Sequence, residues 1–175
     1  MWGTNVSDYD ALAQIFPFEV DLAASDENHK HPVYLTAYDN ALEYDWSKWK
    51  VGFMNPPKRN SKPFIDRAIY WRERCSFTTV VLTEVPTWKP QTAYYIENAT
   101  YTIFTTKREF ISPAGHMGAG FGDAGWAVLV FTNGEWPISD LLIPGWFTES
   151  DLVWYTKGWL EQVKPIHMSR QTRML

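Results

Sequence analysis

The sequence predicts an α/β domain of three layers, built on a mostly parallel sheet. Strand-like and helix-like segments alternate along the chain, which is typical of a parallel sheet covered by helices on both faces. The β-branched run FTTVVLTEV, residues 77–85, indicates a central strand that is buried on both faces. Two further strand-like runs, residues 99–111 and 125–133, would close the sheet.

The first hundred residues supply the other elements of this domain. Strands are expected at residues 18–25, 31–38 and 49–55, and helices at residues 7–16, from 61 onward and at 87–98. Ser7 or Asp8 would cap the first helix. Ser61 would cap the second, with Pro63 in its first turn. The buried stripe of the second helix would consist of Phe64, Ile65, Ala68 and Ile69.

The later part of the chain differs in character. The glycine-rich stretch over residues 112–125 lies between two expected strands and opens no helix, so it favours a hairpin loop over a phosphate loop. We expect one main domain over residues 1–134 and an appended Trp-rich segment over residues 135–175. Within that segment a helix capped by Ser150 is expected, with Leu152, Val153, Leu160 and Val163 as its apolar residues.

Composition narrows the class of protein. The chain has 175 residues, 45% of them apolar and 21% charged, as expected for a folded globular domain. Cys75 is the only cysteine, and the pair His29 and His31 lacks a partner cluster, so we expect no disulfide and no metal. No apolar run reaches the length of a membrane helix, so we expect no membrane partner and a cytoplasmic location.

The chemistry that the sequence supports centres on Asn55-Pro56-Pro57, directly behind a short apolar strand. An exocyclic amine on adenine is a poor nucleophile because its lone pair is delocalised into the ring. Acceptors placed on the amine hydrogens draw that lone pair out. An asparagine oxygen and a backbone carbonyl held by consecutive prolines are a suitable acceptor pair. The alternative interpretation is that the three residues only end a strand.

Several segments resemble the phage-type DNA N6-adenine methyltransferase family. They are WGTN (2–5), FEVDLAASDENHK (18–30), YLTAYDNALEYDW (34–46), VGFMNPPKRNSKPFIDRA (51–68), VVLTEVPTW (80–88) and WAVLVF (126–131). The resemblance covers about three quarters of the chain. It implies a Rossmann-like methyltransferase fold with seven strands, the last antiparallel. It also implies S-adenosylmethionine as cofactor, DNA as partner and a role in evading restriction, in a host cytoplasm if the chain is phage-encoded.

The resemblance also implies roles for particular residues. Asn55, Pro56 and Pro57 would form the catalytic turn, with Asn55 and Pro56 accepting from the target amine. Lys58 is counted with them, but its role is not implied by the resemblance: its stem can lie along apolar surface while its charge reaches a phosphate beside the flipped nucleotide. The residues expected to contact the cofactor are Thr4, Asp21, Ala23, Ala24, Ser25, Asp39 and Asp45, without a choice between Asp39 and Asp45 for the ribose. Apart from the resemblance, three residues are expected to contact DNA: Phe53, Arg59 and Trp88. Phe53 and Trp88 fall at strand ends that face the same cleft, so either could stack on the flipped base.

Lys58 keeps a second hypothesis open. The family usually has an aromatic residue directly after Asn-Pro-Pro, and a lysine offers no ring to stack on a base. The alternative is therefore a catalytically degenerate relative that binds DNA or a host protein without turnover. A modification enzyme for another amine, on glutamine or a nucleoside, would share the Asn-Pro-Pro chemistry. The Trp-rich segment over residues 135–175 favours a homodimer or a protein partner there.

Overall fold

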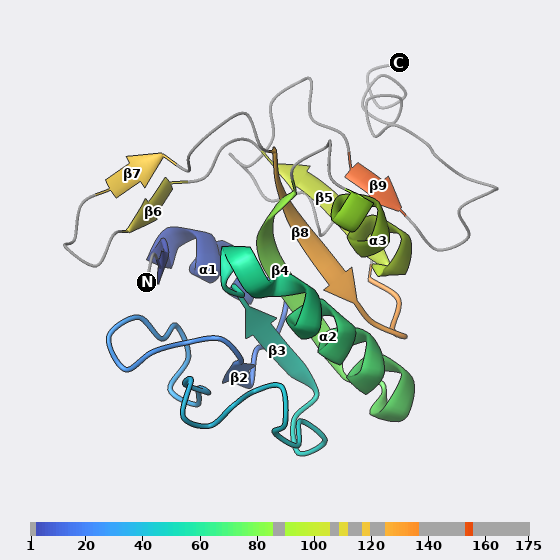
Figure 1. Ribbon diagram of the computed structural model, residues 1–175, viewed down its shortest axis with the longest axis horizontal. Helices are drawn as coiled ribbons and strands as arrows, with labels where there is room; N and C mark the ends of the chain where they lie inside the picture. The colour runs from blue at the N-terminus through green and yellow to red at the C-terminus, as the bar shows by residue number, and fades with distance from the viewer. Residues whose placement is uncertain are drawn as a thin grey trace.

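A mixed β-sheet forms the centre of the computed structural model, with helices packed against it (Figure 1). In spatial order its strands are β2 (Val20–Asp21), β3 (Val51–Met54), β4 (Thr78–Val85), β8 (Gly125–Phe131), β5 (Tyr101–Thr105) and β9 (Val153–Tyr155). The structure describes residues 3–85, 90–105, 109–111, 117–119, 125–136 and 153–155.

The strand directions confirm a mixed α/β fold. Strand β2 pairs parallel with β3, and β3 pairs parallel with β4. Strand β8 lies between β4 and β5 and runs antiparallel to both, so β5 points the same way as β4. The described residues supply six strands to this sheet, so the count of seven stays a prediction.

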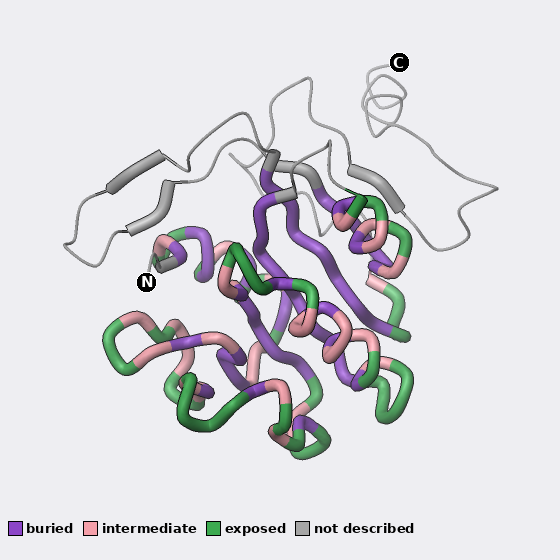
Figure 2. Tube along the Cα trace, in the orientation of Figure 1, coloured by how far each residue is buried: buried purple, intermediate pink, exposed green. Residues whose placement is uncertain are grey.

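Helices pack on both faces of the sheet. They are α1 (Val6–Ala13), α2 (Ser61–Cys75) and α3 (Pro90–Asn98), with a 3₁₀ turn, η1 (Lys58–Asn60), before α2. Side chains alternate between the faces along a strand. Val80 and Leu82 of β4 therefore join a cluster with Leu12 of α1, whereas Val81 joins Ile65 of α2 in a second cluster. Figure 2 shows the buried strands between the partly exposed helices.

The first helix begins earlier than predicted. Its N-cap is Asn5, whose side-chain oxygen accepts from the Ser7 N–H at 3.2 Å. Ser7 and Asp8 lie inside the helix, so the prediction that one of them caps it is wrong. An Asn-to-N2 contact of this kind satisfies one of the backbone donors that a helix start leaves unpaired. The second helix has Asn60 as its N-cap and Ser61 as its first helical residue, so the prediction that Ser61 caps it is wrong as well; Ile65 and Ala68 are fully buried, as predicted.

The segment 31–38 is a loop, so the strand predicted there is wrong. Its backbone touches the sheet at one place, where Asp21 donates to the Val33 carbonyl and accepts from the Leu35 N–H, at 3.0 and 2.8 Å. Pro32 lacks the N–H that a longer ladder would need at that position. The strand predicted at residues 18–25 is likewise reduced to Val20–Asp21.

The run over residues 99–111 divides between two sheets instead of forming one strand. Its first part is β5, while β6 (Glu109–Ile111) joins a separate sheet of order β1-β6-β7. Strand β1 is Gly3–Thr4, and β7 is Met117–Ala119. The glycine-rich stretch therefore contributes a strand as well as a connection, because β7 pairs antiparallel with β6.

Two features from beyond residue 134 pack with the main domain. Val153–Tyr155 is strand β9, paired with β5, so the helix predicted through Val153 is wrong at these residues. Ser150, Leu152, Leu160 and Val163 lie outside the described residues. The Trp136 N–H donates to the Tyr101 hydroxyl at 2.9 Å, and its ring lies 4.7 Å from that of Phe16. The domain boundary at residue 135 stays a prediction.

Candidate active site

Three polar residues from distant segments lie at one edge of the sheet. Asp21 ends β2, Asn55 directly follows β3, and Glu84 is the last residue but one of β4. These strands are adjacent and parallel. Their carboxyl ends therefore face the same edge, which is where ligands bind in open α/β sheets. The candidate active site lies at this edge.

Asn55 is held by a residue from the start of the chain. Its Nδ2 donates a hydrogen bond to the Oγ1 of Thr4 at 2.8 Å, and the Thr4 side chain is buried. Among the described residues, none donates to Asn55 Oδ1. An amide oxygen has two acceptor lone pairs. The arrangement thus fixes the amide by its donor end and leaves its acceptor end for a ligand.

The two prolines hold the backbone beside Asn55. Pro56 is buried, and Pro57 caps the start of η1 with a φ of −57°. The Pro57 carbonyl accepts from the Asn60 N–H at 2.9 Å, which closes the turn. That turn does not use the Pro56 carbonyl. Neither proline can donate from its backbone nitrogen, so this stretch presents acceptors to a ligand.

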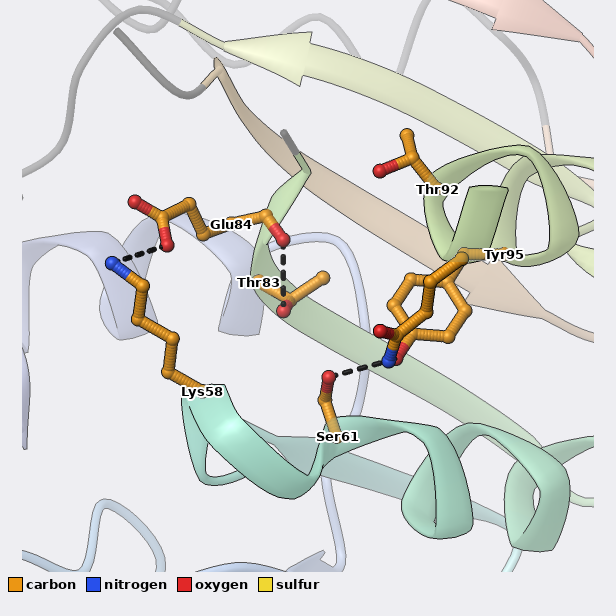
Figure 3. Close-up of a pocket in the computed structure, with 7 residues that line it drawn as sticks. Lys58, Ser61, Thr83, Glu84, Thr92 and Tyr95 are labelled. Carbon is orange, nitrogen blue, oxygen red and sulfur yellow. Dashed lines mark hydrogen bonds and ion pairs between the residues drawn. The ribbon is translucent and has the colours of Figure 1, made fainter. Parts of the chain in front are cut away.

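Lys58 forms an ion pair that the sequence did not predict. Its Nζ lies 2.6 Å from the Oε2 of Glu84 (Figure 3). The Lys58 side chain is 63% exposed, whereas that of Glu84 is 6% exposed. A buried carboxylate is costly unless it is paired. One feature of the sequence could have indicated this ion pair: Glu84 is the single acidic residue in an otherwise apolar and threonine-rich strand.

A small polar pocket opens beside this ion pair, between η1, α2, β4 and α3. Its lining residues are Lys58, Ser61, Thr83, Glu84, Gln91, Thr92 and Tyr95 (Figure 3). The Ser61 hydroxyl and the Tyr95 hydroxyl are 2.7 Å apart, and the Gln91 amide donates to the same Tyr95 oxygen. One wall of the pocket is therefore fixed by its own hydrogen bonds. The residues of this wall were not predicted from the sequence.

Asp21 organises the loop that follows β2. Its buried carboxylate accepts from the Ala23 N–H at 3.3 Å and from the Lys30 N–H at 3.0 Å. Burial raises the pKa of Asp21, although these hydrogen bonds and the Lys30 charge act to lower it. The pKa of Tyr9 is raised to about 12, by burial first and then by Asp21. The carboxylate thus shapes the predicted cofactor loop from within.

Three small residues, Ala23, Ala24 and Ser25, belong to this loop. Ala24 is buried, and Ala23 and Ser25 are half-buried. The Ser25 N–H donates to the Asn28 Oδ1 at 2.8 Å, which bends the chain back. Their role in cofactor binding stays a prediction.

Asp39 and Asp45 are exposed caps of two turns. Asp39 accepts from the N–H and the hydroxyl of Thr36, both at 2.8 Å, and these bonds lower its pKa. Asp45 accepts from the Ser47 N–H at 2.9 Å, and hydrogen bonds with Ser47 lower its pKa too. Both carboxylates are ready to accept from a hydroxyl, and the choice between them stays open.

Of the three residues predicted to contact DNA, the structure contradicts one and leaves the other two as predictions. Phe53 is 1% exposed, and its ring packs edge-on against Tyr9 and Phe18, with centroids 5.2 and 5.5 Å apart. The prediction that Phe53 stacks on a base is therefore wrong, because its ring is part of the core. Arg59 is exposed on η1, and its contact with DNA stays a prediction. Trp88 lies outside the described residues.

The described part of the chain contains neither a metal-binding cluster nor a helix that could cross a membrane. There, no three His, Cys, Asp or Glu side chains gather so as to hold a metal ion. None of the described helices has the length and apolar character needed to cross a membrane.

The sheet and its edge define an α/β protein whose ligand site offers rigidly held acceptors beside a polar pocket. A family model described as DNA N-6-adenine-methyltransferase (Dam) matches residues 1–133, and the chain belongs to this family. The family inferred from the sequence segments is confirmed, and with it the assignment to the methyltransferases.

Other comparisons add little to the family match. No curated protein matches the chain. Among solved structures, the chain is similar to the crystal structure of a "putative RNA methyltransferase" from Pyrococcus horikoshii, with a TM-score of 0.33 and 17% identity. The similarity covers 57% of this chain and 49% of that one, so the chain spans about half the length of that structure.

Proposed function

We propose that the protein transfers a methyl group from S-adenosylmethionine to the N6 amine of adenine in DNA. The observation that carries the proposal is the hydrogen bond from Asn55 Nδ2 to Thr4 Oγ1, which leaves Oδ1 as an acceptor at the carboxyl edge of the sheet. The family match supports the same chemistry.

The residues at the end of β2 fit such a cofactor. Ala23 and Ala24 have small side chains that let a ligand approach the backbone, and Asp21 fixes their loop. The exposed carboxylates of Asp39 and Asp45 can accept from ribose hydroxyls. When bound, S-adenosylmethionine supplies an activated methyl group. The seven-stranded, Rossmann-like arrangement that the resemblance implies is part of this proposal.

The residues of the turn act on the amine. Asn55 Oδ1 and the Pro56 carbonyl would each accept from one N6 hydrogen. This favours a pyramidal nitrogen whose lone pair is free to attack. Both acceptors are fixed before the substrate binds, Asn55 by Thr4 and Pro56 by the turn that η1 closes. The base must leave the duplex to reach them.

A second candidate is a degenerate relative that binds DNA or a protein partner without turnover. It is favoured by Lys58, which follows the turn where the family usually has an aromatic residue and is held in an ion pair. Phe53 cannot replace the missing ring because it is buried. A partner would meet the Trp-rich segment over residues 135–175.

Tritiated methyl transfer from S-adenosylmethionine to mixed DNA and RNA distinguishes the two candidates. The proposed function predicts incorporation into DNA adenine, found as N6-methyladenine after nucleoside digestion. Calorimetry that shows cofactor binding without any incorporation would support the degenerate relative instead. Incorporation into RNA alone would reassign the substrate.

A further inference from the structure

The Lys58–Glu84 ion pair lies at the edge of the polar pocket, just after the catalytic turn (Figure 3). An ammonium group carries three N–H donors. The contact with Glu84 uses one of them, and among the described residues Lys58 has no other partner. Two donors of a fixed ammonium group are therefore available to a ligand at this position.

The chemistry of the pair favours a neutral acceptor over a phosphate. An exposed lysine in a DNA-binding protein usually contacts phosphate. Here a nearly buried carboxylate lies 2.6 Å from the same nitrogen, so a phosphate would meet a neutralised cation and a like charge. An uncharged lone pair avoids that repulsion and still gains a charge-assisted hydrogen bond.

The Lys58–Glu84 pair lies near Asn55, because Glu84 is on the strand that pairs with β3. Met54 is paired with Val81, so Asn55 is level with Leu82 and Glu84 lies two residues further along. With usual strand dimensions, the Cα atoms of Asn55 and Glu84 are about 8 Å apart. The Oδ1 of Asn55 and the carbonyl of Pro56 are acceptors, so this pair can bind the amine but not the ring nitrogens of adenine, which are acceptors themselves.

We propose that Lys58, held by Glu84, is a specificity-determining residue that donates a hydrogen bond to an unprotonated ring nitrogen of the base whose amine Asn55 engages. Glu84 is a positioning residue, because it keeps the ammonium from swinging into solvent. The ligand class is an amino-substituted nitrogen heterocycle with a bare ring nitrogen. The inference rests on the proposed function and deepens it.

The inference is tested by removing the lysine from the protein and the ring nitrogen from the DNA base, separately and together. Random-sequence DNA duplexes are prepared with adenine, or with 1-deaza-, 3-deaza- or 7-deazaadenine in its place. The kcat/KM of tritiated methyl transfer is measured for the wild-type chain and for Lys58→Met. We expect Lys58→Met to lose on the order of tenfold on adenine DNA, the equivalent of one good hydrogen bond. On the one analogue that lacks the nitrogen read by Lys58, it should lose nothing further.

Matched variants separate this effect from general loss of charge or fold. Lys62 is also exposed and pairs with Asp66 at 2.7 Å, away from the lining of the pocket, so Lys62→Met should keep the wild-type rate on all four duplexes. The double variant Lys58→Met/Glu84→Gln leaves no unpaired carboxylate and should repeat the pattern of Lys58→Met. If Lys58→Met loses activity equally on all four duplexes, the inference is overturned but the proposed function is not. A wild-type chain inactive on all four would overturn the proposed function, and the inference with it.

Discussion

Asn55 and Thr4 lie 51 positions apart in the sequence, yet the Asn55 amide donates to the Thr4 hydroxyl at 2.8 Å. Thr4 belongs to β1, which pairs with β6 outside the main sheet. The orientation of the proposed catalytic amide therefore depends on a strand that contributes nothing to the central sheet. The threonine expected near the cofactor acts, in this geometry, as a positioning residue for Asn55.

Replacing Thr4 with valine should lower kcat for methyl transfer by on the order of tenfold, because the amide loses the contact that orients it. Valine keeps the shape of the buried side chain, so cofactor affinity by calorimetry should stay within about twofold. Thr79→Val is a matched control, since Thr79 is also buried. An unchanged kcat for Thr4→Val would show that the hydrogen bond does not orient the amide in catalysis.

Replacing Thr79 with valine should also change the stability of the protein. Its side chain is 0% exposed, and its Oγ1 has no partner within the described part of the chain. A buried hydroxyl without a hydrogen bond costs about 1–3 kcal/mol, which an apolar side chain of the same shape avoids. Thr79→Val should therefore raise the free energy of unfolding by about 1 kcal/mol in urea titrations. A lower value in the variant would mean that the hydroxyl is satisfied in solution.

Gly52 should resist even a single added methyl group. A Cβ at this position of β3 would lie 2.8 Å from both Leu22 Cδ1 and Phe77 Cζ. Both neighbours are buried in the core and have little room to move. We expect Gly52→Ala to lower the free energy of unfolding by about 1–3 kcal/mol, as overpacking does. Urea unfolding of the two proteins measures this, and equal midpoints would contradict the packing described for β3.

Asp21 gives the protein a stability that depends on pH. Burial raises its folded-state pKa above the ordinary value of 3.8, so the folded chain keeps a proton that the unfolded chain releases. The corresponding stability is complete below pH 3.8 and is lost as the pH rises through the raised pKa. Asp21→Asn cannot titrate and keeps one acceptor oxygen for the loop.

The free energy of unfolding of the wild type, minus that of Asp21→Asn, should accordingly fall as the pH rises from below 3.8 toward neutrality. Urea titrations of both proteins across this range measure the difference. A difference that stays constant would show that the hydrogen bonds from Ala23 and Lys30 cancel the effect of burial, and one that grows with pH would show that they outweigh it; either result contradicts the prediction.

The sequence predicted those parts of the fold that depend on local pattern. The β-branched run around Val80 and Val81 is a central strand, and a helix does follow the prolines, although Asn60 and not Ser61 is its N-cap. A strand was wrongly predicted over residues 31–38 because their alternation of apolar and polar residues fits a strand. In the structure this segment is a loop that holds the backbone of Asp21 through two hydrogen bonds.

Only the part of the candidate site that lies within a sequence motif could be predicted from the sequence. Asn55-Pro56-Pro57 could be located from chemistry and spacing, but its partner Thr4 comes from a distant strand that sequence periodicity does not place. Glu84 was hidden inside the central strand, because the direction of one side chain at a strand end depends on tertiary packing. Phe53 was misassigned for the same reason, since its ring faces α1 and not the open edge.

The acceptor role of Asn55 is the central claim, and Asn55→Ala tests it most directly. Tritiated methyl transfer to DNA and calorimetric binding of S-adenosylmethionine are measured on the wild type and the variant. We predict that transfer falls by on the order of a hundredfold or more, as for a lost transition-state contact, while cofactor affinity stays within about twofold. Equal transfer by the two proteins would contradict the account and reduce Asn-Pro-Pro to the end of a strand.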